Sequence, residues 1–139
     1  MKIEDYFSNL ERGLNQNVKL GSPEQPIICL ASDNYNGLVR CRIFFWDESY
    51  LDLYEVGNTE QGYPVKVHYT YAYMRGGERI FRYDNAPHHP EIPTYPHHKH
   101  LGPKDVLTAS PEPTLAQVLT EIEIFLNSTS QPSTWSETQ

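Results

Sequence analysis

The sequence predicts an α+β fold, built as one antiparallel sheet with a helix before it and a helix after it. Apolar residues recur at helical spacing near both ends, and the middle of the chain alternates between apolar and polar residues in segments joined by short turns. Such consecutive strands favour a meander, here of about five strands, whose apolar face is covered by a helix. We expect a single domain over residues 1–127 and a disordered polar tail over 128–139.

The first helix is predicted over residues 2–14. Its apolar stripe, with spacings of three and four, consists of Ile3, Tyr6, Phe7, Leu10 and Leu14. Gly13 and the polar residues 15–17 favour an end of the helix there, and residues 21–26 have the composition of a loop.

Five segments are typical of strands: residues 27–32, 38–46, 50–56, 63–74 and 78–84. The fourth alternates most regularly, which predicts that the odd-numbered residues from Val65 to Tyr73 share one face, with Lys66 and His68 on the other. Gly76 and Gly77 tolerate positive φ and therefore predict a tight hairpin between the last two strands.

The last helix is predicted from a wide apolar stripe: Leu115, Val118, Leu119, Ile122, Phe125 and Leu126. Thr114, followed three residues later by Gln117, predicts a capping box in which each side chain bonds the backbone N–H of the other. Pro111 and Pro113 keep the helix from starting earlier.

Charge and composition narrow the classes of function. The formal net charge of −7 argues against a general polyanion-binding surface. Cys29 and Cys41 lie in apolar, strand-like runs, so we expect free buried thiols and no disulfide scaffold. The N-terminus has no signal-peptide core and no run is long enough for a membrane helix, so we expect a cytoplasmic protein without membrane contact.

The candidate functional residues gather in the Pro/His-rich stretch, residues 81–100 (FRYDNAPHHPEIPTYPHHKH), which holds five of the six histidines. Its four prolines fix φ and remove backbone donors. We therefore expect a stiff loop from Ala86 onward, between the last strand and the last helix, with neither helix nor central strand. Groups that titrate near neutral pH on a rigid loop are typical of a reactive site.

Two chemistries suit these histidines. Two or three of them could ligate Zn²⁺, but the spacings lack helical His-x-x-x-His geometry and no Cys-x-x-Cys pair completes a site, so no metal or other cofactor is predicted. The second chemistry is cleavage of RNA by its own 2′-hydroxyl, which needs a base, an acid and cationic groups near the phosphate.

For this second chemistry, the candidate catalytic residues are His88, His89, His97, His98, His100 and Arg82. The candidate substrate-binding residues are Tyr83, Lys99, Arg40, Arg42, Lys66 and His68. Arg40 and Arg42 have an alternative role as exposed sheet residues paired with acids on the next strand. Asp84 and Asn85 are assigned to the turn that ends the strand, where Asp84 also has the position to orient a histidine.

These residues resemble a known family. Tyr6-Phe7 in the first helix, the Pro/His-rich stretch and the acidic C-terminal helix are similar to the TumE family, also described as a domain of unknown function. The resemblance covers roughly residues 1–126, without a match over 23–61. It implies the toxin of a type II toxin–antitoxin pair, with a helix-turn-helix antitoxin as partner and RNA or the translation machinery as target. The matching positions are Arg82, Tyr83, Asp84, Asn85, Pro87, His88, His89, Pro90, Pro96, His97, His98, Lys99 and His100.

The leading hypothesis is therefore a toxin that acts on RNA as a metal-independent endoribonuclease. One alternative is a non-enzymatic module in which the proline–tyrosine loop and an exposed sheet edge bind a partner protein. Another is a metal-dependent nuclease that uses the same histidines.

Overall fold

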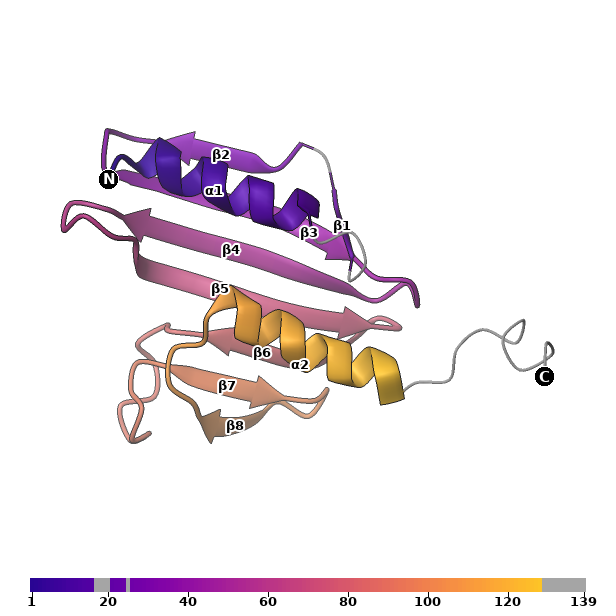
Figure 1. The fold of residues 1–139 in the computed structure, drawn as a ribbon. Helices are drawn as coiled ribbons and strands as arrows, with labels where there is room; N and C mark the ends of the chain where they lie inside the picture. The colour runs from indigo at the N-terminus through magenta and orange to yellow at the C-terminus, as the bar shows by residue number, and fades with distance from the viewer. Residues whose placement is uncertain (17–20, 25, 129–139) are drawn as a thin grey trace.

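The computed structural model describes residues 1–16, 21–24 and 26–128. The elements in chain order (Figure 1) are α1 (Ile3–Gln16), β1 (Ser22–Pro23), β2 (Ile28–Ala31), β3 (Asn36–Phe44), β4 (Tyr50–Asn58), β5 (Val65–Arg75), β6 (Glu78–Asp84), β7 (His98–Leu101), β8 (Val106–Ala109) and α2 (Leu115–Ser128). The predicted α+β class, with one sheet between two helices, is confirmed. The tail predicted over 128–139 lies outside the described residues, apart from Ser128 at the end of α2.

All strands join one antiparallel sheet in the order β1-β3-β4-β5-β6-β7-β8, and β2 also pairs with β3. From β3 to β8 each strand pairs with the next in sequence, which is the predicted meander. The predicted number of about five strands is too low, because the sheet has eight. The three missed strands are short: β1 falls in a segment predicted as loop, and β7 and β8 follow the prolines of the Pro/His-rich stretch.

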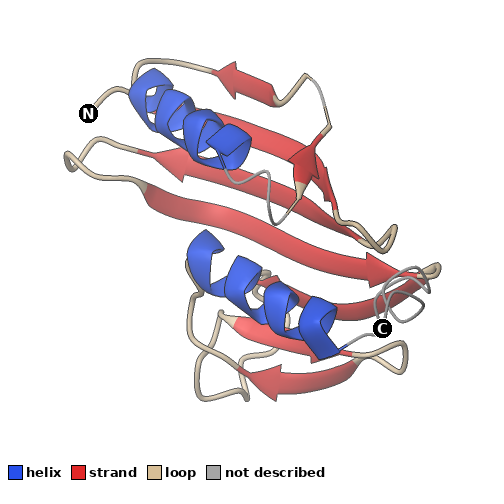
Figure 2. Ribbon diagram, turned by 45° about the vertical axis from the view of Figure 1, so that its right-hand side comes forward, coloured by secondary structure: helices blue, strands red, loops and turns tan. Residues whose placement is uncertain are grey.

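Both helices cover the same face of the sheet, as Figures 1 and 2 show from two directions. Helix α1 lies over the β2–β4 half and α2 over the half that contains β6. The core between them and the sheet is apolar and rich in tyrosine: Ile3, Phe7, Leu14, Val39, Ile43, Leu51, Leu53, Tyr69, Tyr71, Tyr73, Phe81, Val118, Ile122 and Leu126. We call this the covered face and the opposite one the helix-free face.

The helix ends and the main hairpin follow the local signals in the sequence. Thr114 Oγ1 accepts a 3.1 Å hydrogen bond from the N–H of Gln117, whose Oε1 accepts a 2.9 Å bond from the N–H of Thr114. Gly76 and Gly77 have φ of 59° and 78° and turn the chain from β5 into β6. Helix α1 continues through Gly13 to Gln16 instead of ending at residue 14. No helix among the described residues is long and apolar enough to cross a membrane.

A β-bulge reverses the predicted facing at the start of β5. The register between β4 and β5 shifts at Val56 and Gly57, so the β5 residues on the two sides of the shift face opposite ways. Tyr69, Tyr71 and Tyr73 share one face, as predicted, and that face is buried. Val65 and Val67, however, are exposed, at 37% and 46%. The prediction that they share the buried face is wrong, because alternation alone does not reveal a bulge.

The Pro/His-rich stretch is not a loop throughout. Residues 85–97 do lack helix and strand, as the prolines predict, and are folded by turn hydrogen bonds such as that from Tyr95 N to the Ile92 carbonyl, 3.0 Å. The residues after Pro96, however, form β7, which pairs with β6 on one side and β8 on the other. The expectation that no central strand occurs after Ala86 is therefore wrong: His98–Leu101 contains no proline, so its backbone donors are free to join the sheet.

Candidate active site on the helix-free face

The Pro/His-rich stretch divides its side chains between the two faces of the sheet. Along β6, Phe81 is part of the covered core and Tyr83 packs against it. Arg82 and Asp84, at the alternate positions, line a hollow on the helix-free face. This alternation separates the charged groups of β6 from its aromatic ones.

Strand β7 repeats the alternation. Lys99 turns to the covered face and donates a 2.5 Å hydrogen bond to Glu121 of α2. His98 and His100 lie beside β6 residues Asp84 and Arg82 on the helix-free face, and both imidazoles are buried. The sequence placed both histidines among the candidate catalytic residues of a loop, but neither His98 nor His100 is open to solvent.

Asp84 is the centre of this buried polar group, with a side chain only 5% exposed. Its Oδ1 lies 2.8 Å from His98 Nε2 and accepts a 3.0 Å hydrogen bond from the N–H of Ala86. Its Oδ2 accepts a 2.9 Å bond from Arg82 Nε and lies 3.5 Å from His100 Nε2. One carboxylate thus holds two imidazoles and a guanidinium in place and shapes the turn that follows β6.

His89 brings a third imidazole to the same place. The ring centroids of His98 and His100 are 4.9 Å apart, and His89 lies 5.2 Å and 6.1 Å from them. One possible ligand nitrogen of each ring lies within 4.8 Å of the other two. Burial, followed by the charge of Arg82, lowers the pKa of His100, which is therefore neutral at pH 7. We call Asp84, His89, His98 and His100 the histidine cluster.

A hollow of about 290 Å³ opens on the helix-free face next to the histidine cluster. His68 of β5, His88 of the segment after β6, and Arg82 all line it, and both histidines are exposed. Tyr54 and Thr70 complete its wall. Sequence reasoning missed Tyr54 and Thr70. Their only signal in the sequence is that each lies on the polar face of an alternating strand.

A larger hollow of about 500 Å³ continues this surface toward β3. Tyr54 and Thr70 line both hollows, so the two hollows are contiguous. Arg40 and Arg42 line the larger hollow. Arg42 makes a bidentate pair with Asp52 of β4, at 2.7 and 3.1 Å, whereas Arg40 is exposed. The basic patch expected from the sequence therefore contains Arg40 and Arg42, whose charge Asp52 partly neutralises. It continues to the basic side chains that line the first hollow, namely Arg82, His68 and His88.

Other candidate residues lie on the covered face, away from these hollows. His97 stacks on Tyr69, and its Nδ1 lies 2.9 Å from the tyrosine hydroxyl. Tyr83 donates a 2.5 Å hydrogen bond to Glu121, the same carboxylate that Lys99 contacts, so α2 is fixed to both β6 and β7. His97, Tyr83 and Lys99 therefore lie on the covered face, where they pack on the core or anchor α2. The sheet separates them from His68 and His88.

Lys66 also reaches the covered face, because of the β-bulge. Its Nζ donates to the Tyr71 hydroxyl at 2.9 Å and to the Pro113 carbonyl at 2.5 Å. Tyr71 and Tyr6 of α1 both donate to the carboxylate of Glu55, which is 2% exposed. Burial and the nearby Glu55 raise the pKa of both tyrosines, so they stay neutral. Sequence reasoning missed this network, for which the signal was an acid at an inward-facing strand position.

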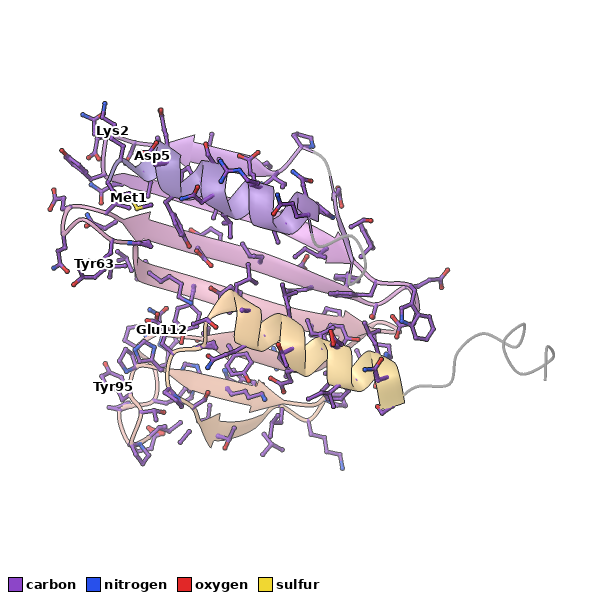
Figure 3. All side chains as sticks on the ribbon, in the orientation of Figure 1. Met1, Lys2, Asp5, Tyr63, Tyr95 and Glu112 are labelled. Atoms are coloured by element: carbon purple, nitrogen blue, oxygen red, sulfur yellow. The ribbon has the colours of Figure 1, made fainter. Side chains whose placement is uncertain are left out.

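Asn85 connects the end of β6 to the bulged part of β5. Its Oδ1 accepts a 3.1 Å hydrogen bond from the N–H of Tyr69, and its Nδ2 donates a 3.0 Å bond to the carbonyl of Val67. These contacts fix the segment that carries His88 relative to the strand that carries His68. Farther along, Ser110 N donates a 2.9 Å bond to Thr94, so the segment before α2 adjoins the stretch at the end of the sheet where Figure 3 labels Tyr95 and Glu112.

The cysteines supply no reactive group, although Cys41 lines the larger hollow. Both are free and half-buried. Burial is the main cause that raises the pKa of Cys29 to about 12 and that of Cys41 to about 11. Both thiols are therefore protonated at neutral pH and are poor nucleophiles.

Comparison with known proteins gives one match. The family model described as Toxin TumE matches residues 28–126. The chain belongs to the TumE toxin family. The match contains the whole Pro/His-rich stretch and the residues of both hollows from 28 onward. It also includes residues 28–61, where the sequence had suggested no match. It does not reach Tyr6-Phe7. No curated protein and no solved structure shows significant similarity to the chain.

Membership in the TumE family has two consequences. The protein has a toxin role, and a toxin of this kind implies an antitoxin partner. The family match does not name a reaction, so the chemistry rests on the geometry of the helix-free face.

Proposed function

We propose that this TumE-family toxin is an endoribonuclease whose reacting groups lie in the hollow lined by His68, His88 and Arg82. The observation that carries the proposal is that these three side chains, from β5, the following turn segment and β6, converge on one open cavity. An acid, a base and a fixed cation are the groups that phosphodiester cleavage needs. Histidine titrates in the range that suits both proton transfers at neutral pH.

In this proposal one imidazole removes the proton from a ribose 2′-hydroxyl, whose oxygen attacks the adjacent phosphorus. The bond from phosphorus to the 5′-oxygen breaks, and the second imidazole gives a proton to that oxygen. The products are a 2′,3′-cyclic phosphate and a 5′-hydroxyl end. Arg82 stabilises the negative charge of the pentacoordinate phosphorus, and the bond from its Nε to Asp84 fixes its position. No step requires a metal ion.

The contiguous hollow toward β3 supports a nucleic-acid substrate. Arg40 and Arg42 line it, and the exposed ring of Tyr54 stands between them and the proposed reacting groups. An aromatic ring beside basic side chains is a common arrangement for binding single-stranded RNA, because bases stack on the ring while cations contact phosphates. The net charge of −7 then restricts RNA contact to this local surface.

The buried candidates take a different role in the proposal. His98 and His100 do not reach solvent, and His97 lies on the covered face. We assign the first two to holding Asp84 and Arg82, which makes them positioning residues. We also propose that the antitoxin is a helix-turn-helix protein, as the sequence resemblance implies, and that it blocks RNA access to the helix-free face.

The test is induced expression in a bacterial host, followed by growth measurement and mapping of RNA ends. The test variant is His68→Ala/His88→Ala, in which both side chains are exposed, so the fold is expected to persist. The matched control is Arg12→Gln, which removes an exposed charge on α1. Growth arrest with new 5′-hydroxyl ends, in the wild type and the control but not in the double variant, is the expected result.

Two outcomes would count against the proposal. Growth arrest with intact RNA would point to a target other than RNA. RNA cleavage that survives in a folded double variant would place the reacting groups outside this hollow. Circular dichroism and thermal unfolding of the purified variants check that the folds are equal.

A further inference from the structure

We propose that the histidine cluster is a binding site for a divalent first-row transition-metal ion, with Zn²⁺ as the best match, held by Asp84, His89, His98 and His100. The donor set is three imidazoles and one carboxylate, which is a combination that zinc prefers. The site adjoins the hollow proposed for RNA cleavage, which Asp84 also lines, but the inference does not depend on that activity.

The orientation of His98 fits a metal ligand. Its Nδ1 lies 2.9 Å from the carbonyl oxygen of Pro96, which can only accept, so this nitrogen carries the hydrogen. The other nitrogen, Nε2, faces Asp84 Oδ1 at 2.8 Å, so either a proton or a metal ion has to lie between the two atoms. A histidine that donates one N–H to a backbone carbonyl and offers the other nitrogen to the metal is the usual arrangement in zinc sites.

His100 repeats this arrangement with a carboxylate. Its Nδ1 lies 2.8 Å from Asp105 Oδ1, although the buried nitrogen makes no well-aligned hydrogen bond. Asp105 is exposed, and its Oδ1 also accepts a hydrogen bond from Arg79, so one carboxylate oxygen lies against both side chains. Nε2 faces Asp84 Oδ2 at 3.5 Å.

The donor spacing is close to that of a tetrahedral site. Metal–ligand bonds of about 2.0 Å at tetrahedral angles place neighbouring donor atoms about 3.3 Å apart. The distances from Asp84 to His98 and His100 are 2.8 and 3.5 Å, on either side of this value. The donor nitrogen of His89 lies within 4.8 Å of the other two, so it must move inward. It has room to do so, because its side chain is 34% exposed and sits outside helix and strand.

One contact must change when an ion binds. Arg82 Nη2 lies 3.3 Å from His100 Nε2, the nitrogen assigned to the metal. A guanidinium and a metal ion cannot share that lone pair, so Arg82 has to turn away. Its side chain is 35% exposed and already lines the adjacent hollow, so the guanidinium has space to rotate into that hollow.

The ion would cross-link three parts of the chain. Asp84 ends β6, His89 lies in the segment that follows, and His98 and His100 belong to β7. Residues 85–97 have no helix or strand, and side chains at the two ends of this segment, Asn85 and His97, bond to β5. A metal bridge through His89 would therefore order the segment that also carries His88.

The experiment is metal analysis of the purified full chain, followed by titration of the chelator-stripped protein with Zn²⁺ and, for spectroscopy, Co²⁺. We expect one equivalent of Zn²⁺ per chain, visible absorption bands typical of tetrahedral Co²⁺, and a rise of several degrees in the unfolding temperature on addition of Zn²⁺. His89→Ala is the main variant, because its partly exposed ring makes loss of the fold improbable, and it should weaken Zn²⁺ binding at least tenfold.

The matched control is His97→Ala, since His97 is close in sequence but contacts Tyr69 on the covered face. It should bind Zn²⁺ as the wild type does. Asp105→Ala, an exposed change, should weaken binding about tenfold, with Asp105→Asn in between, because Asp105 orients His100. Zn²⁺ binding below a tenth of an equivalent, or an affinity that His89→Ala leaves unchanged, would overturn the proposal. RNA cleavage is scored separately with His68→Ala/His88→Ala, which changes none of the proposed metal ligands.

Discussion

The two faces of the sheet each hold one buried carboxylate with several polar partners, and they use it differently. On the covered face, Glu55 accepts hydrogen bonds from Tyr6 and Tyr71 beneath the two helices. On the helix-free face, Asp84 contacts two histidines and Arg82, and it also lines an open hollow. The first group joins a helix to the sheet, and the second group is next to space that a ligand can occupy.

This difference shows why burial alone does not identify a reactive site. Glu55 is the more deeply buried carboxylate, but its neighbours are tyrosines whose raised pKa keeps them neutral. Its contacts therefore stabilise the fold and offer no proton transfer near neutral pH. Asp84 is surrounded by imidazoles and a guanidinium, and solvent reaches the adjoining Arg82. Substitutions on the two faces should consequently separate stability from activity.

The largest expected effect is on activity at the helix-free face. In a purified RNA-cleavage assay, His68→Ala/His88→Ala should lower kcat/KM about 10³-fold, because both proposed proton-transfer groups are lost. The free energy of unfolding, measured by urea denaturation, should change by less than about 0.5 kcal/mol, since both side chains are exposed. A large loss of stability would mean that these histidines belong with the structural residues instead.

A smaller effect, on stability, is expected at the covered face. Glu55→Ala should lower the free energy of unfolding by about 3 kcal/mol, because it leaves the hydroxyls of Tyr6 and Tyr71 without their acceptor and removes the negative charge near the half-buried Lys66. Glu55→Gln keeps one acceptor oxygen and should cost less. Urea denaturation of both variants measures the difference. If Glu55→Ala were as stable as the wild type, the network would not be what holds α1 to the sheet.

The start of α2 gives an effect of about 1 kcal/mol. Thr114→Ala removes the hydroxyl that caps the N–H of Gln117, which destabilises the helix that covers β6. Thr114→Ser keeps the hydroxyl and should unfold like the wild type. Thermal unfolding compares the two variants, and equal unfolding temperatures would show that the cap contributes nothing here.

The smallest effect is expected from the exposed pair between Arg42 and Asp52 on the helix-free face. Both side chains are more than 40% exposed, so solvent screens their attraction. A double-mutant cycle with Arg42→Ala and Asp52→Ala should give a coupling free energy of about 0.5 kcal/mol or less. If the pair serves RNA binding, Asp52→Ala should tighten binding by freeing Arg42, which a filter-binding assay measures. A coupling above about 1 kcal/mol would make the pair structural.

Local signals in the sequence predicted much of the fold. The Gly76-Gly77 turn, the Thr114–Gln117 cap and the alternation of Tyr69, Tyr71 and Tyr73 each depend on residues close together in the chain. The bulge in β5 depends instead on how β4 pairs with it, and the alternation does not record that register. This is why Lys66, predicted for the same face as His68, lies on the opposite one.

The candidate site was predictable in composition but not in arrangement. The density of histidines singled out the stretch that contributes Arg82 and His88 to the hollow and all four members of the histidine cluster. The prolines, however, hid β7, so His98 and His100 were expected in a loop. Their burial depends on Asp84 in a neighbouring strand and on Asp105 after β7, contacts across the sheet that spacing in the sequence does not encode.

The order of the strands has a consequence for how the chain reaches its native state. From β3 to β8 every pairing joins neighbours in sequence, so the sheet can grow one hairpin at a time, and every closure except that over residues 85–97 restricts only a short loop. Chains with such local contacts fold faster than those that must first bring distant segments together. A toxin that folds early gives its antitoxin little opportunity to capture an unfolded chain. We therefore expect neutralisation to act on the finished surface, and adding antitoxin to the folded toxin should suffice to stop its effect.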